Sequence, residues 1–511
     1  MTGPSPRTPA LDLIEAVVDP GSRRSWDEPV AVTTEDESYR ADLERARELT
    51  GLDESVVTGE GRIRGRRVAF VACEFRFLAG SIGVAAGERL VRAVERATEE
   101  RLPLLAVPAS GGTRMQEGTV AFVQMVKVTA AIASLKAAGL PYLVYLRHPT
   151  TGGVLASWGS LGHVTGAEPG ALIGFLGPRV HEALYGEEFP SGVQTAENLL
   201  AHGLVDAVFP ARQLPGVAAR ALAVLCGDAD PEGPDSRSHE PAGRDTAAAP
   251  DTPAAESLQR SRRPERPGVR ALLKVAGREV TPLSGTAAGE HDPGLLLALA
   301  RIGGTPCVVL GHDRRAESAP PLGPGGLREA RRGMRIAAEL NLPLLTVVDT
   351  AGAALSREAE EGGLAAEIAR CLADLVTLSA PTLCLLLGQG AGGGALALLP
   401  ADRVLAARHA WLSPLPPEGA SAIMYRTTDR AEEAAARQGV RSADLLAHGI
   451  VDRVIEEAPE DGGDGDAADG PSAFLTRLGT VLGSELAALR AEKPTARLAA
   501  RRLRHRGLGA R

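Results

Sequence analysis

Short apolar runs alternate with amphipathic segments along most of the chain. Apolar residues at helical spacing predict a helix over residues 118–138, and another around residues 367–378. Six of the apolar runs are predicted strands: residues 104–107, 143–146, 171–175, 344–348, 383–387 and 404–406. Strands that alternate with helices through glycine turns indicate an α/β fold with parallel sheets.

The alternation stops twice. Residues 227–268 are rich in Pro, Asp, Arg and Ala and have almost no large apolar side chains, which is typical of a disordered linker. Residues 456–472 are acidic and glycine-rich, and we expect them to loop out before a last helix near Ser472. The sequence therefore predicts two domains, residues 1–226 and 269–511, joined by a linker at 227–268.

The two predicted domains repeat one another. RLPLLAVPASGG at Arg101 matches NLPLLTVVDTAG at Asn341, and GLPYLVYLRHPTTGGVLAS at Gly139 matches SAPTLCLLLGQGAGGGALA at Ser379. Both pairs share an offset of 240 residues, and AHGLVDAVF and AHGIVDRVI form a third pair. Two unrelated α/β units also share apolar strands and glycine turns, but a constant offset favours duplication of one domain.

Composition excludes several classes of function. The formal net charge of −8 argues against a nucleic-acid-binding coat. The longest uncharged run, residues 375–401, contains GQGAGGG and reads as a buried strand, turn and helix rather than a membrane span. The five cysteines form no CxxC pair, which excludes a zinc ribbon. With no apolar signal core at the N-terminus, we expect a cytoplasmic protein with reduced thiols.

Four glycine turns are the candidate chemistry. They lie at residues 110–112, 150–153, 349–352 and 388–395, each where a strand gives way to a helix. Such turns present backbone N–H groups that can hold a phosphate or stabilise an oxyanion, although they can also serve only as tight connections. No GxxxxGK[ST] motif is present, and the GxGxxG match at Gly388, Gly390 and Gly393 lacks its acidic partner. No sequence context typical of a catalytic triad surrounds His148, His163, His181 or His202.

Longer motifs carry a family resemblance. The first half is similar to the β subunit of the acetyl-CoA carboxylase carboxyltransferase, in SGGTRMQEG (110–118), PTTGGV (149–154) and EPGALIGF (168–175). The second half is similar to the α subunit, in DTAGA (349–353), GAGGGA (390–395) and PEGAS (417–421). The resemblance implies a β–α fusion with two crotonase-like domains (ββα superhelix) in tandem.

This family moves a carboxyl group from carboxybiotin on a carrier protein to acetyl-CoA, giving malonyl-CoA. The resemblance implies one oxyanion hole from Gly111 and Gly112 for the thioester oxygen, and another from Gly393, Gly394 and Ala395 for the biotin carbonyl. It also implies that the remaining matched residues contact the substrate: Arg76, Gly80, Ser81, Arg114, Thr151, Gly152, Gly153 and Gly352. Arg114 is the expected contact of the coenzyme A phosphates, whereas Arg89 and Arg92 read as solvated helix charges.

The chain must take its partners from elsewhere. It has no biotinylation motif and no ATP-binding domain, so we expect a biotin carboxyl carrier protein and a biotin carboxylase as partners, without a membrane or a nucleic acid. The family builds its site between protomers, which implies a homodimer or a higher homo-oligomer. Alternatives are a propionyl-CoA or other acyl-CoA carboxyltransferase, a malonyl decarboxylase, or a non-catalytic assembly subunit. No zinc is expected, because the family's four-cysteine ribbon is missing.

Overall fold

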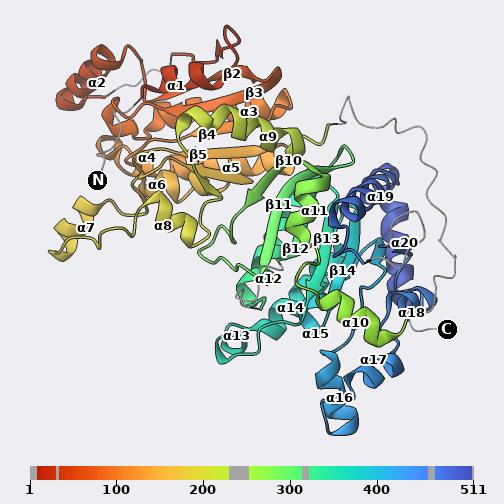
Figure 1. The fold of residues 1–511 in the computed structure, drawn as a ribbon. Coiled ribbons are helices and arrows are strands. Elements are labelled where there is room, and N and C mark those ends of the chain that lie inside the picture. Colours follow the sequence, from red (N-terminus) through yellow and green to blue (C-terminus); the bar gives the residue numbers. More distant parts are fainter. Residues whose placement is uncertain (1–7, 30–33, 229–251, 314–320, 458–465, 509–511) are drawn as a thin grey trace. The chain divides into compact units, whose positions relative to one another are not determined.

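The computed structural model describes residues 8–29, 34–228, 252–313, 321–457 and 466–508. The chain forms two compact units (Figure 1). The first unit comprises Met1–Cys226 with Ala287–Glu290, and the second comprises Gly227–Thr286 with His291–Arg511. Each unit is built on one seven-stranded sheet.

The first sheet has the strand order β1-β2-β3-β4-β5-β7-β9. Strands β1 to β3 are antiparallel and the others run parallel to β3. A small sheet pairs β6 with β8. The strands are β1 (Arg24–Ser25), β2 (Val56–Ile63), β3 (Arg66–Cys73), β4 (Leu104–Val107), β5 (Tyr142–Leu146), β6 (Thr150–Thr151), β7 (Val164–Ala167), β8 (Ile173–Gly174) and β9 (Ala207–Val208). The helices are α1 (Ala10–Val17), α2 (Glu37–Thr50), α3 (Val84–Glu99), α4 (Gly118–Phe122), α5 (Gln124–Ala137), α6 (Gly152–Leu155), α7 (Pro178–Tyr185), α8 (Ala196–Ala201) and α9 (Leu214–Leu225).

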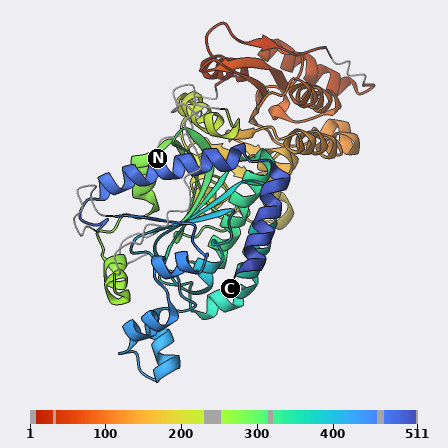
Figure 2. The ribbon, with the colours of Figure 1, turned by 90° about the vertical axis from the view of Figure 1, so that its right-hand side faces the viewer.

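The second sheet repeats this topology in the order β10-β11-β12-β13-β14-β15-β16, again with an antiparallel start. Figure 2 shows its two last helices in dark blue beside the strands. The strands are β10 (Gly277–Leu283), β11 (Leu295–Ile302), β12 (Thr305–His312), β13 (Leu344–Thr350), β14 (Thr382–Gly390), β15 (Arg403–Ala407) and β16 (Arg453–Ile455). The helices are α10 (Ala254–Arg262), α11 (Val269–Ala276), α12 (Pro324–Leu340), α13 (Arg357–Glu361), α14 (Leu364–Thr377), α15 (Gly392–Leu396), α16 (Pro417–Tyr425), α17 (Ala431–Gln438), α18 (Ser442–Ala447), α19 (Pro471–Ala491) and α20 (Pro494–Gly507).

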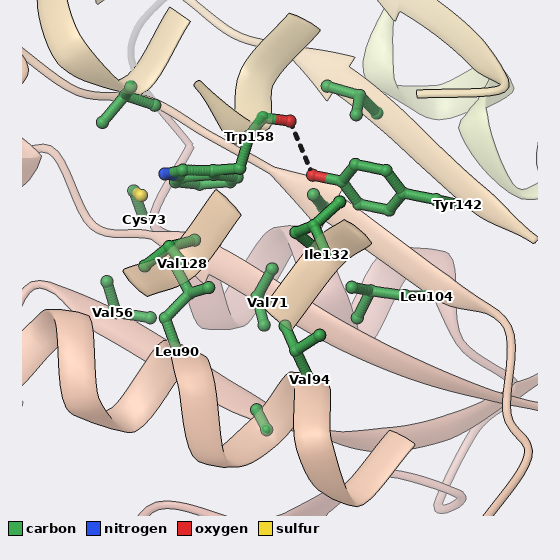
Figure 3. Close-up of a cluster of buried hydrophobic side chains, with 14 of the residues drawn as sticks. Val56, Val71, Cys73, Leu90, Val94, Leu104, Val128, Ile132, Tyr142 and Trp158 are labelled. Atoms are coloured by element: carbon green, nitrogen blue, oxygen red, sulfur yellow. Dashed lines mark hydrogen bonds between the residues drawn. The ribbon is translucent and has the colours of Figure 1, made fainter. Parts of the chain in front are cut away.

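The core of the first unit lies between the sheet and helices α3 and α5. Leu90 and Val94 of α3 and Ile132 of α5 pack over β3, β4 and β5 (Figure 3). The Tyr142 hydroxyl donates a hydrogen bond to the backbone carbonyl of Trp158 at 2.8 Å. The polar atom of the buried tyrosine is therefore satisfied. The layer fixes where the strands end, and therefore where the glycine turns lie.

Most predicted strands form, but two elements differ. Residues 171–175 were predicted as a strand; only the two-residue β8 forms there, in the small sheet, and the strand next to β5 in the main sheet is β7. The predicted helix over 118–138 is broken into α4 and α5, which are bent by 45°. The helical spacing is confirmed on both sides of the break, although Val120 and Val126, which belong to that spacing, point to solvent. No single helix among the described residues is long and apolar enough to cross a bilayer; residues 115–122 and 124–137 meet that test only as a bent pair.

The structure corrects the predicted linker in its second part. Residues 254–262 form the helix α10, and Leu258 and Arg266 are buried in the second unit. Composition misled the prediction because the buried contacts of this segment are made by one leucine, one arginine and small side chains. Residues 229–251 of the predicted linker, like 458–465 of the predicted acidic loop, lie outside the described residues.

Candidate active site

The turn after β4 in the first unit is fastened to the start of α6. Thr151 N–H donates to the carbonyl of Ser110 at 2.9 Å, and Ser110 N–H donates to that of Pro149 at 2.7 Å. Gly112 N–H donates to the Ser110 hydroxyl at 3.0 Å. These bonds place residues 110–112 directly beside Gly152, the first residue of α6.

The second unit repeats the arrangement 240 residues later. Gly352 N–H donates to the Thr350 hydroxyl at 3.1 Å, and Ala391 N–H donates to the Thr350 carbonyl at 3.1 Å. The first amide of each short helix, that of Gly152 in α6 and Gly392 in α15, donates to a loop carbonyl at 2.9 Å. The duplication therefore preserves the hydrogen bonds around the turn as well as the fold.

The next amides in each helix start are the candidate donors to a substrate. Amides in the first turn have no acceptor within their own helix. In α6 these amides belong to Gly153 and Val154, and in α15 to Gly393 and Gly394. Clustered N–H groups of this kind can stabilise an oxygen that gains negative charge during a reaction. The donor role predicted for Gly393 and Gly394 fits this position and stays a prediction, whereas the amide of Ala395 is the first that bonds within the helix, to the carbonyl of the N-cap Ala391.

The geometry corrects the role predicted for Gly111 and Gly112. Gly111 N–H already donates to the carbonyl of Ala79 at 2.9 Å, and Gly112 N–H to the Ser110 hydroxyl. Gly112 has φ +103°, and a Cβ placed on it would lie 3.3 Å from the Gly153 nitrogen. The contribution of Gly112 is therefore the absence of a side chain, which leaves the Gly153 amide uncovered. Sequence motifs could not show this, because the acceptor for Gly111 and the Gly153 amide beside Gly112 belong to other segments of the chain.

Gly80 and Ser81, predicted to bind substrate, hold the neighbouring loop in place. A Cβ on Gly80 would lie only 2.1 Å from the carbonyl oxygen of Ala109, so this close approach requires glycine. The Ser81 hydroxyl donates to the carbonyl of Leu78 at 2.7 Å and accepts from Arg114 at 3.2 Å. Both residues therefore support the first turn from behind.

Arg114 cannot contact the coenzyme A phosphates as predicted. Its side chain is fully buried, donates to both carboxylate oxygens of Glu54, and also donates to the Ser55 and Tyr39 hydroxyls. Burial lowers the pKa of Arg114, but the hydrogen bonds and charge of Glu54 outweigh burial, and the net pKa is raised. Arg114 is thus a permanent buried cation that ties the loop of Glu54 to the first turn.

The other arginines considered as substrate contacts or helix charges differ in how exposed their side chains are. Arg89 was expected to be solvated, but its side chain is 3% exposed and donates to Asp53 at 2.6 Å, so that prediction is wrong. Arg92, 53% exposed and paired with a neighbour on its helix, is a solvated charge as expected. Arg76 is 39% exposed and bonds to Glu74 at 3.0 Å, and its substrate contact stays a prediction. The contacts predicted for Thr151, Gly152, Gly153 and Gly352 also stay predictions; the structure places all four in the two turns.

A buried polar pair lies beneath the second turn, and sequence reasoning missed one of its members. Asp349 accepts from Gln389 N–H at 3.0 Å, and its own N–H donates to His312 Nδ1 at 3.3 Å. Burial lowers the pKa of His312 to about 4, so the imidazole is neutral at physiological pH. The available signal was the place of His312 as the last residue of the apolar strand β12, where the equivalent strand β3 of the first unit ends in Cys73.

Two units, each with a helix start beside an anchored turn at the carboxyl edge of a sheet, make up a tandem crotonase-like fold. Solved structures share it: transcarboxylase 12S, from a hexameric assembly with hydrolysed methylmalonyl-coenzyme A bound, aligns with a TM-score of 0.71 and 22% identity over 92% of this chain and 89% of that one. This likeness shows the fold alone.

Sequence comparison defines the family. The profile of the carboxyl transferase domain matches residues 7–461. A probable biotin-dependent acyl-coenzyme A carboxylase beta3 subunit from Mycobacterium bovis is 60% identical over 499 residues, 97% of this chain and 98% of its own. The acetyl-coenzyme A carboxylase carboxyl transferase subunits beta/alpha of Salinispora arenicola are 42% identical over 430 residues, 82% of this chain and 76% of theirs. The chain belongs to the carboxyl transferase family and is a transferase, which confirms the resemblance.

Proposed function

We propose that this protein is the carboxyltransferase component of a biotin-dependent acyl-CoA carboxylase, with acetyl-CoA as acceptor and malonyl-CoA as product. The names of the relatives from Mycobacterium bovis and Salinispora arenicola support the reaction class. A carrier protein and a biotin carboxylase would supply the carboxyl group.

The observation that carries the proposal is the pair of matched helix starts. Transfer to the α-carbon of a thioester passes through an enolate, whose oxygen is negative, and the leaving ureido oxygen also gains charge. A reaction with two oxyanions needs two sets of donors, and each unit supplies one, at Gly153 in α6 and at Gly393 and Gly394 in α15. Carboxybiotin itself supplies the activated carboxyl group.

The residues around the turns fit this division of labour. Glycine at 112 leaves the Gly153 amide open to a ligand, since a Cβ at that position would lie 3.3 Å from the amide nitrogen. His312 is neutral and hydrogen-bonded to the backbone of Asp349, so it positions the turn rather than taking a proton. The chain therefore acts by orienting its substrates and polarising their carbonyl groups.

We further infer that a second copy of the chain completes the working enzyme. Val120, Phe122 and Val126, on α4 and at the start of α5, are 59–72% exposed and follow the first turn closely in sequence. Apolar side chains that gather in this way are typical of protein interfaces. Light scattering at working concentration should show a dimer or larger; an active monomer would contradict this inference.

The decisive experiment is reconstituted carboxylation. The protein, a biotinylated carrier and a biotin carboxylase are combined with ATP, labelled bicarbonate and acyl-CoA esters of increasing length. Incorporation into acetyl-CoA supports the proposal, and incorporation only into propionyl-CoA or longer esters would refute the acetyl-CoA assignment. Loss of label from malonyl-CoA without a carrier would indicate a decarboxylase, and no turnover in either assay would indicate an assembly subunit.

A further inference from the structure

The helix α10 packs against the second turn. It comes from the stretch whose composition predicts a linker. Its Ala254 and Leu258 pack in one cluster with Ala391, the residue before α15, and with the buried ring of Trp411. The Trp411 indole N–H donates to the hydroxyl of Ser261 at 2.8 Å. The helix thus holds the aromatic side chain that lies against the turn.

Trp411 in turn holds the backbone of the turn. The backbone N–H of Trp411 donates to the carbonyl of Gly388 at 3.2 Å. Its carbonyl oxygen would lie 2.5 Å from a Cβ at Gly390, which shows how closely the two backbones approach. Two residues further along the chain, Ser413 N–H donates to the Gly390 carbonyl at 2.9 Å. The chain from Gly388 to Gly392 has little freedom on this side.

Arg266, at the end of the same segment, fixes the point where the turn begins. It donates to the carbonyl of Leu387, immediately before Gly388, at 2.8 Å. It also donates to both carboxylate oxygens of Glu457, at 2.7 and 2.6 Å. The side chains are 1% and 0% exposed. Glu457 accepts from the N–H of His409 at 2.9 Å, so the pair joins the ends of three neighbouring segments.

We propose that Arg266, with α10, is a positioning residue for the transfer reaction: it sets where the N–H groups at the start of α15 point. The inference rests on the proposed function, because it assumes that these N–H groups act in catalysis. It assigns a part in the chemistry to a segment that carries no motif of the family resemblance and contacts the turn only from behind.

The size of the rate loss expected for a variant at Arg266 follows from the geometry. Lysine at 266 retains the charge, but its three donors are on a single nitrogen, which cannot replace the planar fork that reaches both carboxylate oxygens of Glu457 and the Leu387 carbonyl. The Leu387 carbonyl then loses its donor, and the turn shifts. A displacement of about 1 Å at a reacting group can cost roughly 100-fold in rate. We therefore expect Arg266→Lys to lower kcat by roughly 10- to 100-fold, with the KM for acetyl-CoA little changed.

The chain offers a matched control, Arg501. Its side chain is fully buried and donates to both carboxylate oxygens of Asp402, at 2.7 and 2.6 Å, and to the carbonyl of Ala380 at 2.9 Å. Asp402 and Ala380 precede β15 and β14, so this pair lies at the opposite end of the same strands. Arg501→Lys therefore damages a similar pair in the same unit without touching the turn.

The experiment compares the two variants in the full chain, by thermal unfolding, by kcat in the reconstituted assay and by hydrogen exchange of residues 388–396. Both should lose thermal stability, but only Arg266→Lys should lose rate and exchange faster in this segment. Equal rate losses in both, or normal rate and exchange in folded Arg266→Lys, would overturn the inference.

A second variant covers the case in which Arg266→Lys fails to fold. Trp411→Phe keeps an aromatic ring and removes the bond to Ser261. It should also lower kcat and speed exchange at residues 388–396, and a normal kcat would overturn the inference. An inactive wild-type protein would instead count against the proposed function. Hydrogen exchange still tests the positioning in that case.

Discussion

The two units keep the same backbone but support it with different side chains. In both, a hydroxyl residue, Ser110 or Thr350, fastens the turn, and the same amide of the helix start is anchored. Behind the first turn lies the buried pair Arg114–Glu54, whereas behind the second lies Arg266, brought by a segment outside the repeat. Duplication has conserved the geometry of the donors, and each copy has acquired its own means of holding it.

The contrast extends to charge. Arg89 of α3 and Glu329 of α12 occupy equivalent places, 240 residues apart. Arg89 is neutralised by Asp53, while Glu329 is 1% exposed and accepts a hydrogen bond from Gly285 N–H at 3.1 Å. Burial raises the pKa of Glu329 to about 7. A shared backbone therefore tolerates opposite charges, provided that each is paired or able to take a proton.

The largest expected effect tests the support of the first turn. Arg114→Met leaves the Glu54 carboxylate buried without its cation, which should cost about 3–5 kcal/mol in the free energy of unfolding. Chemical denaturation measures the change. The double variant Arg114→Met, Glu54→Gln removes both charges and should regain most of the loss; a double variant as unstable as the single one would contradict the pairing.

The next effect tests the corrected role of Gly112. Gly112→Ala covers the Gly153 amide, and loss of one oxyanion donor costs roughly 100-fold in kcat. Steady-state kinetics in the reconstituted assay measures this. Gly65→Ala is the control, since Gly65 also has positive φ (+81°) but lies in the β2–β3 hairpin with open space around it. Equal losses of rate in both variants would mean that backbone strain, and not the covered amide, is responsible.

The charge contrast predicts a pH dependence in the second unit. The folded pKa of Glu329, about 7, lies above its ordinary value of 4.5, so the folded state holds this proton more tightly. Its contribution to stability is complete below about pH 4.5 and is lost as the pH rises through 7. Glu329→Gln should therefore stabilise the protein by about 2 kcal/mol at pH 8 and little at pH 4.5. Melting curves at both pH values test this; equal shifts would contradict it.

The smallest effect separates Arg92 from its buried neighbours. Its partner Glu88 is also on the surface of α3. Exposed pairs contribute little, so Arg92→Ala should change the free energy of unfolding by less than about 0.5 kcal/mol. A loss above about 1 kcal/mol in urea denaturation would show that this position resembles buried Arg89 after all.

The pattern of apolar residues predicted what depends on local sequence. Most strands, the duplication and the positions of the helix starts followed from runs of Val, Leu and Gly. The failures depend on contacts between distant residues. Arg266 meets Glu457 across 191 residues, so its burial left no local trace. The amide of Gly111 finds its acceptor at Ala79, in a loop that no motif places beside it.

The helix predicted over residues 118–138 depended on an apolar pattern that includes Val120 and Val126. Its helical spacing is real, but those side chains face outward, and the core side of α5 is formed by Val128, Ile132 and Leu135. Periodicity shows that a helix has an apolar face without showing whether the same chain covers it.

The burial of Arg266 limits how the polypeptide could be divided. If the chain were expressed as two separate proteins, in the manner of an enzyme made from two genes, a cut at residue 268 would seem natural from composition. The second protein would then lack the cation of Glu457 and the helix behind Trp411. A workable cut would have to fall before Thr252, so that the second product keeps α10 and Arg266.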